Sequence, residues 1–466
     1  MRVRSHWLKQ ALATDTAVAA TLAGEERADV VIVGGGFCGL WTALTIKERE
    51  PSRDVVVIER DICGGGASGR NAGYIINLWA KFPTLLEMMP SDEAVRVARA
   101  AADAVGEIAA FCERHAIDAA LRRPGWLWGA TCAGQAEGFD DALETLARHQ
   151  LAPFERLTGR EIAERWGIEG HVDGVLEPSC MLVQPAKLVR GLRRVALDNG
   201  VRIFENSPMT RLERRSPARV VTDKGAVTAA KAVIAMNAWA AALPELRRAF
   251  VVTAAEAAVT PPMPERLADL GFADAPGTTD SRVMIANYRP TIDGRVEFGK
   301  GGGGLAFAGR VGDFFEGHAH RLAAMRENLA QGIPALADVE IEHSWCGPID
   351  RNWTGVPMAG PLPGCANIFF CVGFSGNGVG PSRLMGKVLA SLVLEHDDEW
   401  SSSGLVRQPT PDFPPEPIRY VGGALVRRAV DRVDRLQQKG RLADPVTRWL
   451  VDQGPAGMVT KAKRGA

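Results

Sequence analysis

A short apolar run that leads directly into three regularly spaced glycines constrains the fold of this chain more than any other feature. Residues Val30 to Val33 have the pattern of a buried parallel strand, and Gly34, Gly36 and Gly39 follow at once. Such glycines permit a tight turn and let the backbone approach a pyrophosphate. The residues from Leu40 to Glu48 favour a helix, whose N-terminus would then meet that pyrophosphate.

An acidic residue follows at the distance that a ribose contact requires. A second apolar run, Val55 to Ile58, completes a βαβ unit and ends at Glu59, twenty residues after Gly39. A carboxylate at this strand end can accept hydrogen bonds from ribose hydroxyls. The alternative, a glycine turn beside a surface glutamate, explains the spacing less well. The pattern therefore predicts a site for the ADP half of a dinucleotide, without distinguishing NAD from FAD.

Length and charge restrict the class of protein. A chain of 466 residues exceeds the usual size of one domain, so we expect two. The formal net charge of +0 provides no basic field for nucleic acid, which we exclude as a partner. The eight cysteines form no CxxC pair and the histidines show no metal-ligand spacing, so we expect neither disulfides nor a metal site. No uninterrupted apolar run reaches about 18 residues, so we expect no transmembrane segment and a cytoplasmic location.

Two further glycine-rich stretches favour FAD over NAD. Gly64 to Gly73, with the sequence GGGASGRNAG, follows the acidic strand and could bring main chain and the Arg70 guanidinium against a flat ring system. A nicotinamide-dependent dehydrogenase has no obvious use for such a loop there. Later, glycines from Gly373 to Gly380 separate a buried strand, Asn367 to Val372, from a helix that ends near Leu394. The N-terminus of that helix could stabilise negative charge at flavin C2 and N1, although a plain glycine-rich turn is the alternative.

Several motifs in one order resemble a known family. They are GASGRNAG (66–73), LVQPAKLVRGL (182–192), AMNAW (235–239), YRPTIDGRVEFG (288–299) and GFSGNGVG (373–380). Together they resemble the FAD-dependent amine oxidases of the D-amino-acid oxidase (DAO) superfamily, over a region from about Ser5 to Leu394. Within it, the motifs are most similar to those of the gamma-glutamylputrescine oxidases, and less similar to those of the glycine and sarcosine oxidases.

The resemblance implies an α/β fold, α+β overall, of the glutathione-reductase flavin type. A discontinuous, Rossmann-like FAD-binding domain would comprise residues 1–80, 151–235 and 345–400. A discontinuous substrate domain, residues 81–150 and 236–344, would place an antiparallel sheet over the flavin. The cofactor is thus expected to be FAD, bound without a covalent link.

The last segment, residues 401–466, is predicted to be an appended helical tail. A proline-rich stretch precedes a basic helix in which Leu425, Ala429, Val433 and Leu436 form an apolar stripe. We expect this helix to pack on the body of the protein or on a dimer partner. Peripheral contact with a membrane, which would allow electron transfer to quinone, is the alternative.

The motifs and the resemblance together predict the residues that contact FAD. They are Gly34, Gly36, Phe37, Cys38, Gly39, Glu59, Arg60, Gly66, Ala67, Ser68, Arg70, Asn71, Ala72, Gly73, Val183, Asn237, Trp239, Gly373, Phe374, Ser375, Gly376, Asn377 and Gly378.

Three residues are predicted to act in catalysis. Asn377 stands where the family often has histidine; it can donate a hydrogen bond but cannot titrate. Lys300 could attract superoxide near flavin N5, as a lysine of sarcosine oxidases does, although that lysine corresponds to Glu297 here; a solvated lysine is the alternative. Tyr288, one of only three tyrosines, is the best candidate to line the substrate site.

The resemblance also singles out residues at the substrate. In glycine oxidase-like members an arginine four places after a tryptophan grips the substrate carboxylate, and here that position, counted from Trp345, is Ile349. A simple α-amino acid held in this way is therefore not expected. Arg289 and Arg351 are weaker candidates for substrate contact. Cys346 lies near the position where sarcosine oxidases attach FAD covalently, but a buried free cysteine is the alternative.

The leading hypothesis is an FAD-dependent amine oxidase. It would oxidise the C–N bond of a primary or secondary amine to an imine, which hydrolyses to an aldehyde or keto product, while O₂ reoxidises the flavin and forms H₂O₂. One alternative is a dehydrogenase of the same fold that passes electrons to a quinone or carrier. Another is a flavin-binding protein that has lost turnover. The expected partners are thus a small amine and O₂.

Overall fold

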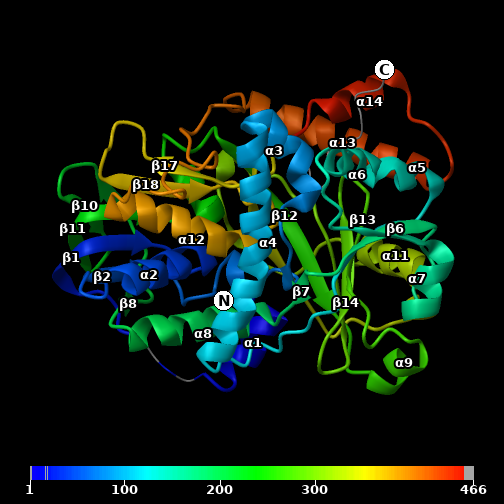
Figure 1. The fold of residues 1–466 in the computed structure, drawn as a ribbon, viewed down its shortest axis with the longest axis horizontal. Helices are drawn as coiled ribbons and strands as arrows, with labels where there is room; N and C mark the ends of the chain where they lie inside the picture. The colour runs from blue at the N-terminus through cyan, green and yellow to red at the C-terminus, as the bar shows by residue number, and fades with distance from the viewer. Residues whose placement is uncertain (1–2, 16, 18, 456–466) are drawn as a thin grey trace.

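The computed structural model describes residues 3–15, 17 and 19–455, which form two large sheets side by side (Figure 1). The first sheet runs in the order β17-β18-β11-β1-β2-β8, and β10 and then β9 continue from β11. Because β1 pairs in parallel with β2 and β11, the carboxyl ends of these strands lie at one edge. The strands are β1 (Gly24–Val33), β2 (Val55–Ile58), β8 (Arg202–Phe204), β9 (Arg211–Glu213), β10 (Ala218–Val221), β11 (Gly225–Ile234), β17 (Met358–Pro361) and β18 (Ile368–Val372).

The βαβ unit predicted from the glycine motif is confirmed. Between β1 and β2 lies α2 (Phe37–Arg49), and α12 (Val379–Leu394) packs against it beside the sheet. The long α4 (Ser91–Arg114) lies against α12 and occupies the centre of Figure 1, and α8 (Pro185–Asp198) packs on α2. Their buried apolar residues form one core with those of β1 and β2, so the turn after β1 rests on a rigid layer.

The second sheet is mostly antiparallel and runs in the order β16-β12-β15-β14-β13-β4-β6-β5; β13 and β4 alone pair in parallel. Strands β14 and β15 form a hairpin, with Gly294 at φ +73° in the turn between them. The strands are β4 (Trp126–Ala130), β5 (Glu155–Thr158), β6 (Asp173–Glu177), β12 (Phe250–Val259), β13 (Gly277–Asp280), β14 (Ala286–Pro290), β15 (Val296–Lys300) and β16 (His343–Asn352).

Short elements join and cover the two sheets. A two-stranded ladder of β3 (Tyr74–Ile75) and β7 (Met181–Leu182) lies between them. The remaining helices are α1 (His6–Leu12), α3 (Phe82–Met88), α5 (Ala133–Ala136), α6 (Asp140–Arg148), α7 (Gly159–Trp166), α9 (Pro264–Asp269), α10 (Asp313–Glu316), α11 (Leu322–Gly332), α13 (Ile418–Gln437) and α14 (Pro445–Asp452).

The predicted domain boundaries differ from the pairing in the structure. Strand β6 pairs with β4 in the second sheet and β5 pairs with β6, whereas the sequence predicts residues 151–235 in the FAD-binding domain. Strand β16 also belongs to the second sheet, on β12. Conversely, α4 packs on α12 of the first unit, although residues 81–150 were assigned to the substrate domain. The chain crosses between the two sheets repeatedly, and pairing between distant segments decides to which sheet each short strand belongs.

The C-terminal tail is part of the body over its described length. Helix α13 lies along the second sheet's side of the molecule (Figure 1). Its Arg427 donates to the Gly303 carbonyl at 2.6 Å. It buries Ala429 and Val430, whereas Leu425 of the predicted stripe remains 46% exposed. These contacts place α13 against the body of the protein. No helix of residues 3–15, 17 and 19–455 is long and apolar enough to cross a membrane.

Candidate active site

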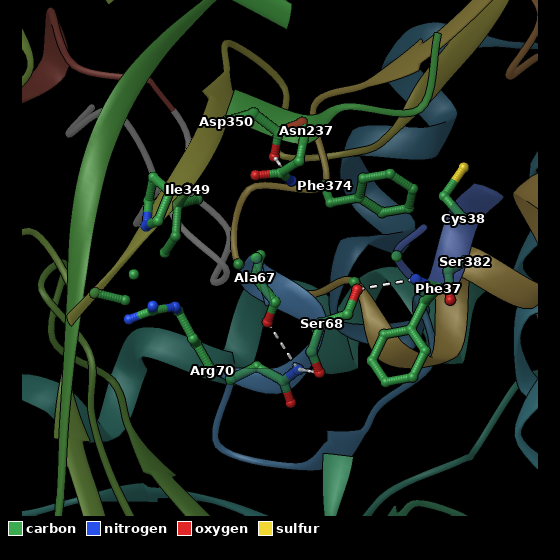
Figure 2. Close-up of a pocket in the computed structure, with 18 of the residues that line it drawn as sticks. Phe37, Cys38, Ala67, Ser68, Arg70, Asn237, Ile349, Asp350, Phe374 and Ser382 are labelled. Atoms are coloured by element: carbon green, nitrogen blue, oxygen red, sulfur yellow. Dashed lines mark hydrogen bonds between the residues drawn. The ribbon is translucent and has the colours of Figure 1, made fainter. Parts of the chain in front are cut away.

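One cavity of about 410 Å³ joins the edge of the first sheet to the face of the second. Its walls include the residues that end β1 and β2 and residues of β12, β15 and β16. Figure 2 shows Ile349 and Arg70 on one side of it and Phe374 and Cys38 on the other. A cavity at the carboxyl edge of parallel strands is where α/β folds bind nucleotides.

The glycine turn after β1 has the geometry that a nucleotide clamp requires. Gly34 has φ +120°, and a Cβ atom there would lie 2.3 Å from the Ala235 carbonyl oxygen. A Cβ at Gly39 would lie 2.0 Å from the Gly34 carbonyl, so helix and turn pack closely. The first N–H of α2, on Phe37, donates to the Ser68 hydroxyl at 2.9 Å (Figure 2). Gly34, Gly36, Phe37 and Cys38 line the cavity; Gly39 lies behind them.

Glu59 lies at the end of β2, as predicted, and lines the cavity. Its carboxylate accepts the N–H groups of Gly35 and Asp61, each at 2.9 Å. Burial raises the pKa of Glu59 to about 7, against the effect of these hydrogen bonds. Because each carboxylate oxygen has two lone pairs, the same group can still accept hydrogen bonds from ribose hydroxyls.

The side chains of Arg60 and Trp239 form the part of the cavity wall next to Glu59. The Arg60 guanidinium lies 4.9 Å from the centre of the Trp239 ring and pairs with Glu316 at 3.3 Å. The indole N–H of Trp239 and the amide oxygen of Asn237 are buried without a hydrogen-bond partner among the described residues. A dinucleotide offers hydroxyl donors and phosphate acceptors for such atoms, so the residues present fit this group.

Val183, predicted to contact FAD, does not line the cavity. Its carbonyl accepts a hydrogen bond from Arg289 at 2.9 Å, and its side chain is buried in the core beside the first sheet. Pro208 and Met209, which the sequence analysis missed, line the nucleotide end instead. They follow β8, which pairs in parallel with β2, so the carboxyl end of this third strand was the available signal.

The small-residue loop from Gly64 to Gly73 forms the floor of the cavity. Gly66, Ala67, Ser68, Asn71 and Ala72 line it, whereas Gly73 does not. Arg70 also lines it, but its guanidinium donates to the carbonyls of Gly65, Cys346 and Val3, each at 3.0 Å. Through these three hydrogen bonds Arg70 links the loop to β16 and to the N-terminal segment.

Asp350, which the sequence analysis did not single out, joins two loops of the site. Its carboxylate accepts the Gly373 N–H at 2.6 Å and the Asn237 side-chain N–H at 2.8 Å (Figure 2). Burial raises the pKa of Asp350 to about 6, although backbone N–H groups oppose the shift. Such a residue cannot be found from local pattern, because its partners lie far away along the chain.

The turn before α12 lies at the cavity, with Phe374, Gly376, Asn377 and Gly378 in its wall; Gly373 and Ser375 lie behind it. The side-chain N–H of Asn377 donates to the Asn77 carbonyl at 3.0 Å. Helix α12 begins at Val379, so the positive end of its dipole lies at the cavity.

Lys300 lines the cavity, but its ammonium group is held elsewhere. Its Nζ donates to the Met284 carbonyl at 3.1 Å, and burial lowers its pKa. Along β15 side chains alternate between faces, so Lys300 shares a face with Phe298, which lies in the core behind the sheet. Glu297 lies on the opposite face and lines the cavity.

Tyr288 and Arg289 do not line the cavity, contrary to prediction. The Tyr288 hydroxyl lies 3.2 Å from the His171 ring nitrogens, and its ring belongs to the core behind the second sheet. The Arg289 guanidinium lies 4.9 Å from the centre of the Trp7 ring. The residue of β14 that lines the cavity is Asn287.

Strand β16 contributes five consecutive residues, Gly347 to Arg351, to the cavity wall. Ile349 and Arg351 both line it, together with Gly347 and Asp350. Cys346 does not line it; its side chain lies in the core between β16 and the first sheet. Burial raises the pKa of the Cys346 thiol to about 12. No three metal-ligating side chains converge anywhere in the part of the chain that the structure describes.

We expect the flavin to be released when the protein is unfolded by heat, because Cys346 has neither the position nor the ionisation for covalent attachment. Burial raises the pKa of this thiol well above neutral pH, so the reactive thiolate is scarce there. Precipitated chain and supernatant can be compared by absorbance. A C346A variant should purify with the same amount of flavin; yellow colour that stays with the wild-type chain and not with the variant would contradict this expectation.

Comparison with known proteins agrees with this arrangement. A family model described as "FAD dependent oxidoreductase" (DAO) matches residues 29–392. Gamma-glutamylputrescine oxidoreductase of Escherichia coli K12 is 30% identical over 368 residues, 78% of this chain and 83% of its own. Glycine oxidase of Geobacillus kaustophilus is 27% identical over 382 residues, 79% of this chain and 93% of its own.

Solved structures share the fold. The crystal structure of L-proline dehydrogenase from P. horikoshii superposes with a TM-score of 0.66 at 18% identity, covering 81% of this chain and 96% of the other. At this identity the likeness establishes fold alone. The family match, which spans most of the chain and both sheets, establishes more: the chain belongs to the DAO family of FAD-dependent oxidoreductases.

Proposed function

We propose that the protein oxidises the C–N bond of a primary or secondary amine to an imine, with O₂ as the final electron acceptor. The amine loses two electrons and two hydrogens, O₂ takes them up as H₂O₂, and water hydrolyses the imine to an aldehyde or keto product. The observation that carries the proposal is one continuous cavity, which reaches from the glycine turn at Gly34 to the face of the second sheet at Ile349. Bound there, FAD supplies the hydride acceptor.

Different residues along that cavity would bind different parts of the cofactor and the substrate. The turn at Gly34, Glu59 and the Arg60–Trp239 wall would hold the ADP half. The loop Gly64–Gly73 and the turn at Asn377 would hold the ring system, where the N-terminus of α12 favours negative charge. Small residues of the second sheet, such as Ala255, leave room for a substrate.

An amine is favoured by the relatives and by one position on β16. The two relatives compared above are named for a gamma-glutamylputrescine reaction and for glycine oxidation, which are both reactions at a C–N bond. Ile349, which lines the cavity, is apolar, so it cannot grip a carboxylate. The proposal therefore favours an amine without an α-carboxylate at that place.

A dehydrogenase that passes its electrons to another acceptor is the second candidate. The observation that favours it is the position of Lys300, whose ammonium donates to the Met284 carbonyl and not toward Glu297's face of β15. If a cation beside the flavin is needed for rapid reaction with O₂, Lys300 is badly placed to supply it.

Anaerobic mixing of the holoenzyme with γ-glutamylputrescine, putrescine or glycine tests both candidates. We expect the flavin absorbance near about 450 nm to bleach with at least one alkylamine, faster than with glycine. Subsequent mixing with O₂ should restore it within the turnover time and release H₂O₂. Bleaching with sluggish reoxidation would replace the oxidase by the dehydrogenase. No bleaching with any amine would leave a flavin-binding protein without this turnover.

A further inference from the structure

Among the described acidic side chains that line the cavity, Glu297 alone lacks a strong partner. The others are each held by a backbone N–H group or a cation: Glu59 by Gly35 and Asp61, Asp61 by Arg4, Glu256 by Arg321, Glu316 by Arg60, and Asp350 by Gly373 and Asn237. Glu297 has only the Asn287 side-chain N–H, at 3.4 Å from its Oε2. Its Oε1 is buried without a hydrogen-bond partner among the described residues.

None of the described elements packed around Glu297 donates a hydrogen bond to its Oε1 atom. On β14, Arg289 lies opposite in register, but its guanidinium donates to the Val183 carbonyl at 2.9 Å and no ion pair joins it to Glu297. On β3, the Tyr74 hydroxyl donates to the Tyr288 carbonyl at 3.0 Å. On β12, the residue in register is the apolar Val259. A fully buried carboxyl with a free lone pair at a cavity wall calls for a donor from a ligand.

We propose that Glu297 binds the ammonium group of the substrate and accepts its proton, so that the site selects cationic aliphatic amines over α-amino acids. This inference rests on the proposed amine oxidation. Glu297 would then be a substrate-contacting residue that sets both orientation and protonation state.

The proton step is balanced within the pair. An N–H bond of the ammonium breaks, an O–H bond forms at Oε1, and the nitrogen keeps the electron pair. Removal of hydride from the adjacent carbon requires this neutral amine, because its lone pair stabilises the developing iminium ion. No further reactant is needed, since the proton remains on Glu297 until product leaves.

The register of the second sheet places Glu297 far from Arg351, the arginine of β16 that lines the cavity. Glu297 is level with Val259 on β12, and Arg351 is level with Val251, eight residues away. At about 3.3 Å per residue this is roughly 26 Å along the strand, too far for the two side chains to hold both charged groups of one α-amino acid. Near Glu297 the lining residues include Ala257, whose methyl group can contact an aliphatic chain and offers no donor to a carboxylate.

Affinity for an ammonium ion should depend on pH in a defined direction. Burial raises the pKa of Glu297 to about 8, and the Arg289 charge and the Asn287 hydrogen bond limit the shift. Below pH 8 the carboxyl is mostly protonated, so binding of a cation must release a proton. The affinity should therefore rise with pH, by up to about tenfold per unit, and level off near pH 8, while an alkylammonium ion stays charged.

The test uses three probes that share one shape and bear no hydrogen on the substituted carbon, so that none can be oxidised there. They are tert-butylamine (a cation), tert-butanol (neutral) and 2-aminoisobutyrate (a zwitterion). Each is titrated into the holoenzyme, and binding is read as a shift of the flavin absorbance spectrum. The variants are E297Q, which keeps the shape and removes the charge, and E340Q, which removes an exposed charge outside the cavity.

We expect tert-butylamine to bind wild type and E340Q more tightly than either other probe, with the stated pH dependence. E297Q should weaken it about ten- to hundred-fold and abolish that dependence, leaving tert-butanol unchanged. Equal affinity of E297Q and wild type would overturn the inference. So would tighter binding of 2-aminoisobutyrate or absence of any tert-butylamine effect in wild type, neither of which depends on a variant.

The outcomes separate this inference from the proposed function. If tert-butylamine binding depends on Glu297 but no amine of the reduction panel bleaches the flavin, the amine oxidation fails while the ammonium site stands. If amines bleach the flavin of E297Q at the wild-type rate and concentration dependence, the oxidation stands and Glu297 has no part in it. An E297Q variant altered only in its reaction with O₂ would likewise overturn the role of Glu297 as an ammonium-binding base.

Discussion

Replacing Gly34 by alanine is expected to abolish stable flavin binding. Gly34 has φ +120°, a conformation that L side chains rarely adopt, and the new Cβ would meet the Ala235 carbonyl oxygen at 2.3 Å. That carbonyl follows β11, which is held in register along β1, so it cannot move without disturbing the sheet. Strain and overlap together amount to on the order of 3 kcal/mol, or about 100-fold in affinity if the turn distorts to relieve them.

The ratio of flavin to protein absorbance after purification measures this effect, and titration of the apoprotein with FAD gives the affinity. Gly24→Ala is a matched control, because Gly24 also has a positive φ of +78° but begins β1, away from the cavity, with no atom within 4 Å of the added Cβ. The control carries backbone strain without the overlap. A G34A protein that purifies with a full complement of flavin would show that this turn does not hold the nucleotide.

The elements around this turn could be predicted from sequence because their signals are local. The apolar run to Val33, the glycines and the run to Ile58 lie within one βαβ unit, and the pairing of β1 with β2 follows from them. The family motifs extended the prediction to the whole architecture. In the βαβ unit the residues that carry the signal also make the structure, without help from distant parts of the chain.

The incorrect predictions of lining residues have two causes. One is which face of a strand meets the cavity, and the other is which strands end at the cavity. The motif YRPTIDGRVEFG marks this stretch but does not show which face of β14 meets the cavity. It therefore favours Tyr288, whereas Asn287 lines the cavity. Phase is decided by pairing with β13 and β15, which a period of two cannot reveal when both faces are buried. Val183 was chosen over Met209 for a similar reason: the order of strands in the sheet is a property of the assembled fold.

Polar partners across the interior were also beyond the reach of sequence. Asp350 is useful only because the Gly373 N–H and the Asn237 amide converge on it. Whether the Oε1 atom of Glu297 has a hydrogen-bond partner depends on all the residues around it in the fold. Burial and hydrogen-bond partners, which a sequence pattern does not show, distinguish both acids from ordinary strand residues.

Glu205 carries the second large expected effect, on stability. It lies after β8, is 3% exposed, and its Oε1 accepts from Arg190 and Arg193, each at 2.9 Å. The same oxygen accepts the Cys63 N–H at 2.8 Å, directly before the loop Gly64–Gly73 that forms the cavity floor. Glu205→Gln would leave the buried Arg193 without its carboxylate and would release one end of that loop. Removing one partner from a buried ion pair destabilises a protein by about 3–5 kcal/mol.

Urea denaturation of the holoenzyme, followed by tryptophan fluorescence and by flavin release, measures the loss for Glu205→Gln. We expect flavin release to shift to lower urea than in wild type by at least as much as the fluorescence, because Cys63 leads into the flavin loop. Glu213→Gln is the matched control: its carboxylate pairs with Arg211, Arg219 and Arg215 at 2.8, 3.2 and 3.3 Å but is 23% exposed. Its loss should therefore change stability by under about 1 kcal/mol. Equal, small shifts for both variants would mean that Arg190 and Arg193 tolerate the neutral amide, Arg190 through its pair with Asp15 at 2.5 Å and Arg193 through hydrogen bonds alone.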